Sequence, residues 1–138
     1  MSALYTPQML ALSAQLARYP WNEGFAHQAE ARSSVCGSTL SIGLDLDDSG
    51  RVSATGLKVS ACAVGQSSAA ILAASGKGAH PDAIAATLAG LREWIAGEGD
   101  LPDWPGLNAI AGARDYAGRH GALLLPWEAA VEALSAPE

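Results

Sequence analysis

Alternating apolar and polar residues predict a pair of β-strands in the middle of the chain. Within residues 38–46, leucine or isoleucine occupies every second position: Leu40, Ile42, Leu44 and Leu46. A period of two is typical of a strand with one buried face. The run Asp47–Gly50 has turn chemistry, and residues 51–60 continue as a second strand. We therefore predict an antiparallel hairpin whose leucine-rich face is covered by helices, with Gly56 allowing a bulge.

Helical patterns flank this hairpin. Thr6 and Pro7 form an N-cap followed by a first-turn proline, and a helical stripe runs from there toward Pro20. Residues 21–33 are predicted to hold a loop and a short edge strand. After the hairpin, helices are expected over four segments: 62–75, 81–96, 108–116 and a final one opened by Pro126. The order of helix, hairpin and helices predicts an α+β fold with helices on one face of an antiparallel sheet.

Composition narrows the class of protein. The 138 residues are 49% hydrophobic and 16% charged, which is enough for one domain over 1–138 with a real core and excludes intrinsic disorder. Fourteen acidic against eight basic residues give a net charge of −6, so a nucleic-acid partner is not expected. Neither a signal peptide nor a membrane-spanning stretch is apparent. We expect a cytoplasmic protein without a membrane partner.

Two cysteines are the candidates for chemistry. Cys62 lies where the second strand ends and a helix begins, and the unpaired amides of a helix N-terminus favour a thiolate. The alternative is a buried structural cysteine. Cys36 lies in a polar, turn-like segment before the first strand. Because a hairpin returns the chain to its starting edge, we expect both thiols at one end of the sheet, with sulfurs about 4–8 Å apart, as in half of a metal site.

Four motifs occur in an order and spacing that resemble a known family. They are Cys36-Gly37-Ser38, the hairpin itself, the run CAVGQSSA from Cys62, and Arg119-His-Gly-Ala-Leu-Leu-Leu-Pro-Trp127. Together they are similar to the IscU/NifU-type iron–sulfur cluster scaffold family, above all to its SufU branch. The resemblance implies a SufE/NifU-like fold with a three-stranded antiparallel sheet. It also implies three cysteines and an aspartate at one end, which hold a nascent 2Fe–2S cluster or zinc.

This sequence departs from the family pattern at two ligand positions. Ser38 stands where the family has aspartate, and Ala122 stands at the third cysteine position. Cys36 and Cys62 therefore remain as cluster or metal ligands, and His120, two residues from Ala122, is the candidate replacement. A site with so few ligands should bind zinc or a 2Fe–2S cluster weakly, so any cluster should be transient and labile, or absent altogether.

The leading functional hypothesis is a non-enzymatic, scaffold-like protein of iron–sulfur cluster assembly, which receives sulfur and iron and transfers a nascent cluster. One alternative is a sulfur-acceptor or accessory protein on the same fold that has lost stable cluster binding. Another is an interaction domain with inert cysteines. The family implies a cysteine desulfurase and client apo-proteins as partners, and we expect a monomer or weak dimer.

Overall fold

A computed structural model describes residues 6–33 and 37–135 of the chain. Its sheet has three antiparallel strands in the order β1-β2-β3. The strands are β1 (His27–Arg32), β2 (Thr39–Leu46) and β3 (Val52–Ser60). The hairpin predicted from the alternating pattern is β2 and β3, and the expected edge strand is β1. The three-stranded antiparallel sheet of the α+β fold is therefore confirmed.

Helices form the rest of the described chain. The α-helices are α1 (Pro7–Gln15), α2 (Ala63–Gly76), α3 (Pro81–Ile95) and α4 (His120–Ser135). Three 3-10 helices join them: η1 (Leu16–Arg18), η2 (Leu107–Asp115) and η3 (Ala117–Arg119). Thr6 caps α1 as predicted, because its hydroxyl accepts a hydrogen bond from the amide of Met9 at 3.1 Å. The helix expected over 108–116 is present, but as the tighter 3-10 form of η2.

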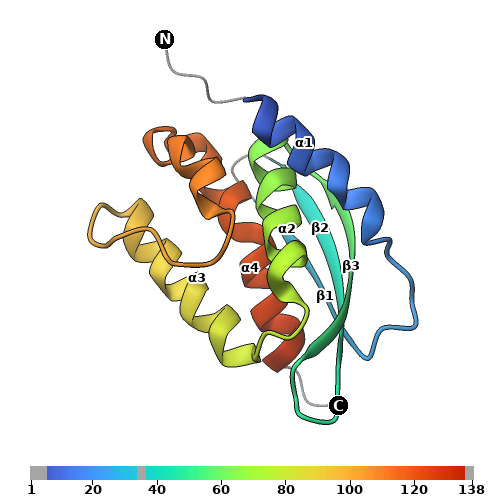
Figure 1. Ribbon diagram of the computed structural model, residues 1–138. Coiled ribbons are helices and arrows are strands. Elements are labelled where there is room, and N and C mark those ends of the chain that lie inside the picture. The colour runs from blue at the N-terminus through green and yellow to red at the C-terminus, as the bar shows by residue number, and fades with distance from the viewer. Residues whose placement is uncertain (1–5, 34–36, 136–138) are drawn as a thin grey trace.

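The helices lie in layers on one face of the sheet. Figure 1 shows α2 and α4 against the sheet and α3 on the far side of α4. α1 packs on α2. Between sheet and helices lie Leu40, Ile42 and Leu44, each no more than 2% exposed, while Leu46 is partly buried at the edge of the core. The predicted covered face of the hairpin is therefore the core face.

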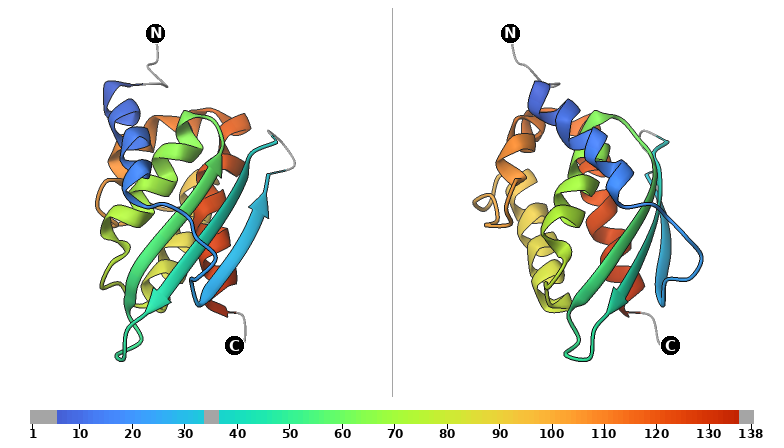
Figure 2. Two further views of the ribbon diagram at one scale, coloured as in Figure 1. Left: turned by 90° about the vertical axis from the view of Figure 1, so that its right-hand side faces the viewer. Right: turned by 45° about the vertical axis from the view of Figure 1, so that its right-hand side comes forward.

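The bulge predicted at Gly56 is wrong. The register of β2 and β3 shifts between Asp45 and Leu46, near the turn, and Gly56 pairs regularly with Gly43. The two glycines instead make room for Phe25: a Cβ atom on Gly43 would lie 2.4 Å from the Phe25 ring, and one on Gly56 would lie 2.3 Å from it. The chain before β1 crosses the outer face of the sheet here, as the left view of Figure 2 shows.

The predicted start of the last helix at Pro126 is also wrong. α4 begins at His120 and contains Pro126. Proline is favoured in a first turn, but the turn before it is held here by burial, since Ala122 and Leu123 are fully buried. The Ser68 hydroxyl of α2 also donates a hydrogen bond to the Leu123 carbonyl at 2.6 Å. Packing against α2 therefore extends the helix on the N-terminal side of the proline.

Candidate functional site

Cys62 is the N-cap residue of α2, directly after β3, as the sequence predicts. Its backbone is extended (φ −67°, ψ 172°), and its side chain makes no capping hydrogen bond to the helix amides. The Cys62 carbonyl accepts a hydrogen bond from the Gln66 amide at 2.9 Å, and the Gln66 side chain donates to the carbonyl of Ala61 at 2.9 Å. The thiol is half-buried against the core. It is thus a free cysteine at a fixed strand-to-helix junction.

The connection between β1 and β2 lies at the same end of the sheet. Thr39 at the start of β2 pairs with Ser60 at the end of β3 and with Arg32 at the end of β1. The Ser33 amide donates to the Ser38 carbonyl at 2.8 Å. Cys36 falls outside the described residues, so the predicted distance between the Cys36 and Cys62 sulfurs stays a prediction.

The first turn of α4 packs against both of these segments. A Cβ atom on Gly121 would lie 2.8 Å from the Ser33 hydroxyl, and one on Gly65 in α2 would lie 3.3 Å from the Ala122 Cβ. Ala122 is fully buried, and Ser38 is 4% exposed. The positions that matched the family's motifs around Cys62, Ser38 and Ala122 therefore come from three separate segments to one end of the fold.

His120 is held on another side of α4. Its Nε2 bonds to the Arg114 carbonyl of η2 at 2.7 Å, and because a carbonyl only accepts, Nε2 is the donor. Nδ1 is then the nitrogen left to bind a metal, as in metal sites where the other ring nitrogen bonds to a backbone carbonyl. Residues two apart on an α-helix differ by about 200° around the axis, so His120 and Ala122 point in different directions. Ligation by His120 remains a prediction.

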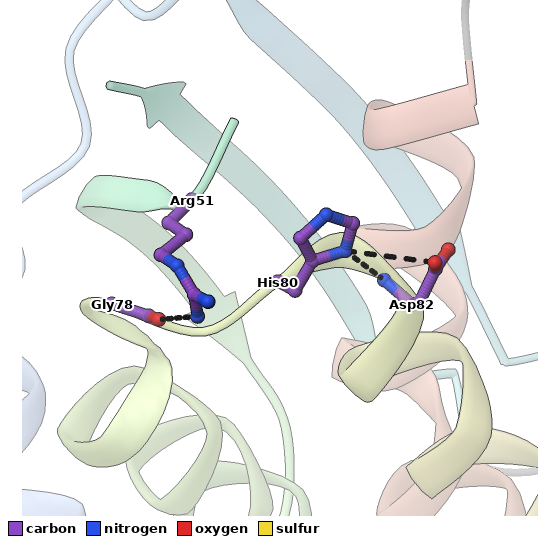
Figure 3. A network of polar contacts seen from close by, with 4 residues as sticks. All are labelled: Arg51, Gly78, His80 and Asp82. Carbon is purple, nitrogen blue, oxygen red and sulfur yellow. Dashed lines mark hydrogen bonds and ion pairs between the residues drawn. The ribbon is translucent and has the colours of Figure 1, made fainter. Parts of the chain in front are cut away.

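The other two histidines lie away from Cys62. His27 begins β1 and pairs with Leu44, toward the far end of the sheet. His80 begins α3 beyond the tip of the hairpin, where its Nδ1 accepts the Asp82 amide at 3.3 Å and lies 3.6 Å from the Asp82 carboxylate (Figure 3). Nearby, Arg51 donates to the Gly78 carbonyl at 3.1 Å. His80 is therefore an exposed helix cap, as the sequence indicates.

The described residues do not complete the family's set of ligands. Among residues 6–33 and 37–135, no three His, Cys, Asp or Glu side chains gather closely enough to hold a metal ion. Ala122 carries no donor atom, and a neutral Ser38 hydroxyl replaces a carboxylate. A closed tetrahedral site needs four ligands. Cys62 is the one thiol that the described residues bring to this end, so a resident metal centre does not fit them.

Two features near the site were not predicted from sequence. A groove of about 520 Å³ runs over the outer face of the sheet, lined by side chains that include Arg32, Ser41, Lys58 and Ser60. Lys58 therefore lies exposed on this outer face. On the inner side, the Ser68 hydroxyl accepts a hydrogen bond from the Trp127 indole at 2.9 Å and is fully buried. Only the strand register shows that the groove residues share one face.

The architecture and the position of the cysteine define a class: an α+β protein with a three-stranded antiparallel sheet and a thiol where β3 meets α2. This is the fold of NifU-like and SufU iron–sulfur cluster scaffold proteins. The crystal structure of a nitrogen-fixing NifU-like protein (N-terminal) from Brucella abortus has a TM-score of 0.86 and 26% identity, covering 94% of this chain and 91% of that one.

A second crystal structure shows the fold alone. It is that of a candidate iron–sulfur cluster assembly scaffold protein for the SUF system from the thermophile Fervidobacterium islandicum AW-1, with a TM-score of 0.86 and 17% identity. The match covers 98% of this chain and 100% of that one. No protein-family model matches the chain, and no curated protein matches it in sequence. None of the described helices is long and apolar enough to cross a membrane.

Proposed function

We propose that this protein acts in iron–sulfur cluster assembly as a scaffold-like carrier, which receives sulfur and iron and transfers a nascent cluster. The observation that carries the proposal is the placement of Cys62. On a NifU-like fold, its thiol lies at the junction of β3 and α2, at the end of the sheet where Ser38 and the start of α4 also lie. A cysteine desulfurase would supply the sulfur, and apo-proteins would take the cluster.

Sulfur reaches Cys62 by exchange between a persulfide and a thiolate. The Cys62 thiolate attacks the terminal sulfur of a persulfide on the donor protein. A new sulfur–sulfur bond forms on Cys62, the donor's sulfur–sulfur bond breaks, and the donor's cysteine leaves as a thiolate. No external oxidant or reductant is needed, because the sulfane sulfur keeps its oxidation state. The half-buried position of Cys62 leaves its thiol open to such a donor.

The cluster itself is cargo in this proposal. Cys36 and Cys62 are the thiolate ligands, and His120 is the candidate third ligand through Nδ1. With Ser38 and Ala122 at the other two positions, fewer strong bonds hold the cargo than in a four-ligand site. Binding should therefore be weak, and the cluster should leave readily for a stronger ligand set.

A second function, favoured by the burial of Ala122, is sulfur acceptance without stable cluster binding. Ala122 is 0% exposed and packs against the first turn of α2, so this position offers no ligand. The Cys62 persulfide would then be the end product on this protein. The two functions share the sulfur-transfer step and differ in whether iron accompanies the sulfur.

A competition titration with a chromogenic zinc chelator tests the assignment of the two altered positions. We expect the Ser38→Asp/Ala122→Cys variant to bind zinc more tightly than the wild type, because it gains a carboxylate and a thiolate at the site. The matched control is Ala130→Cys, which adds a thiol at an equally buried position of the same helix. Ala122→Cys alone serves if the buried aspartate disturbs folding.

Equal zinc affinities in the wild type and in both site variants would contradict the placement of Ser38 and Ala122 at ligand positions. Tight stoichiometric binding by the wild type, lost in His120→Ala, would show that the histidine has replaced the missing ligand. In that case the proposed lability of the cargo would be wrong, while the location of the site would stand.

A further inference from the structure

The two edges of the β-sheet differ in what covers them. On the outer edge of β3, the Leu57 amide donates to the Tyr19 carbonyl at 2.8 Å, and Val52 bonds to the 78–79 turn. On the outer edge of β1, no backbone hydrogen bond joins residues 27–32 to a described segment other than β2. The left view of Figure 2 shows β1 at the rim of the sheet with no described element beyond it.

The hydrogen-bonding pattern shows which β1 residues present their backbone to this open edge. In an antiparallel pair, hydrogen-bonded and non-hydrogen-bonded positions alternate. The Ser33 amide bonds to Ser38, so Arg32 is in a non-hydrogen-bonded position, and so are Glu30 and Gln28. The N–H and C=O groups of these last three residues therefore point away from β2.

A bond on the other side of the sheet supports this assignment. The same alternation, carried across β2, directs the backbone of Ser41 toward β3 and that of Leu57 away from β2. Leu57 does donate outward, to Tyr19. The orientation of the β1 backbone groups thus follows from one consistent pattern across the sheet.

We propose that the open edge of β1 binds a second copy of this chain through antiparallel pairing of the two β1 strands about a two-fold axis. Backbone bonds across the axis must join outward-facing residues. A register centred on Ala31 does this, because it places Glu30 opposite the partner's Arg32 and Arg32 opposite the partner's Glu30. Each of these two pairs exchanges two backbone bonds, and each brings opposite charges together.

Charge selects this register over the neighbouring one. Charged side chains on an exposed edge usually prevent strand pairing. Centring the pair on Glu30 would place this carboxylate opposite the partner's Glu30, which is unfavourable. Centring it on Ala31 makes the strand complementary to itself. Since few backbone bonds form and the chain carries a net charge of −6, the dimer should be weak and concentration-dependent.

Sedimentation equilibrium at increasing protein concentration tests the pairing with charge-exchange variants. Glu30→Arg and Arg32→Glu each bring like charges together twice, and each should weaken self-association about tenfold or more. The double variant Glu30→Arg/Arg32→Glu should restore it. Glu93→Arg on α3 and Lys58→Glu on β3 make the same changes of charge away from the edge and should retain dimerisation.

A backbone variant tests the edge independently of charge. Glu30→Pro removes an outward N–H that β1 does not use within its own sheet, so it should abolish the dimer while the far-UV circular dichroism stays that of the wild type. The proposal is overturned if the wild type is monomeric at every concentration up to the solubility limit. It is also overturned if the double charge variant associates as weakly as the single variants, or if Glu30→Pro dimerises like the wild type.

Discussion

Asp47 is the residue whose electrostatics the turn changes most clearly. Its Oδ1 accepts hydrogen bonds from the Ser49 hydroxyl at 2.6 Å, the Ser49 amide at 2.9 Å and the Arg51 amide at 3.0 Å. The Ser49 hydroxyl first, and then the Arg51 amide, hold the pKa of Asp47 below its ordinary value of 3.8. The turn is therefore fixed by a side chain that the sequence shows only as part of an acidic run.

A lowered pKa makes the stabilising effect of Asp47 depend on pH. Because the pKa is lower in the folded than in the unfolded chain, the contribution is present above pH 3.8 and is lost as the pH falls through the folded pKa. We expect a carbon-13 NMR titration to place the Asp47 midpoint below 3.8, and Ser49→Ala to raise that midpoint. An unchanged midpoint in Ser49→Ala would show that the hydroxyl is not the main cause.

Leu44 tests the core face of the hairpin at the same scale. It is 1% exposed between the sheet and the helices, so Leu44→Ala should lower the free energy of unfolding by about 2–5 kcal/mol. Leu10, which is 64% exposed on α1, is the matched control, and Leu10→Ala should change it by less than about 0.5 kcal/mol. Urea unfolding measures both, and equal effects of the two substitutions would contradict the assigned core face.

At the scale of elements, the contact of Phe25 with the glycine pair fixes the segment before β1 on the outer face of the sheet. A methyl group on Gly43 would overlap the Phe25 ring, so Gly43→Ala should destabilise the fold by about 1–3 kcal/mol. In a Phe25→Ala background the same substitution should cost much less, because the overlapping ring is gone. Gly112→Ala meets no atom within 4 Å and is the control.

A double-mutant cycle of urea unfolding for Gly43 and Phe25 measures this coupling. If Gly43→Ala has the same effect with and without Phe25, the ring does not lie over the glycines. The register of β2 and β3 would remain, since it rests on the turn and on the buried face of the hairpin.

Elements formed by local patterns could be predicted from sequence, and those set by distant contacts could not. The alternation at Leu40–Leu46 and the Thr6 cap each depend on neighbouring residues, and the structure has both. The bulge at Gly56 and the helix start at Pro126 were wrong, because Phe25 and Ser68 decide them from distant parts of the chain. Proline and glycine patterns describe what the backbone allows, whereas packing selects among the allowed forms.

At the scale of the whole molecule, the fold and the position of Cys62 could be predicted, but the arrangement of the ligand positions only in part. Motif order placed Ser38 and Ala122 near Cys62, and strand register and helix packing bring them to one end. The direction of His120 depends on the Arg114 carbonyl of η2, a contact that spacing along the chain does not reveal. A match of motifs indicates neighbouring positions better than it indicates side-chain direction.

The sulfur and iron content of the loaded protein tests the central claim most directly. The wild type and Cys62→Ser would be incubated without air with a cysteine desulfurase, cysteine and ferrous iron, freed of small molecules, and analysed for sulfane sulfur, acid-labile sulfide and iron per chain. We predict sulfur on the wild type, with iron that a chelator removes readily, and neither above background on Cys62→Ser with an unchanged circular dichroism spectrum. Equal sulfur and iron on the two proteins would contradict the account.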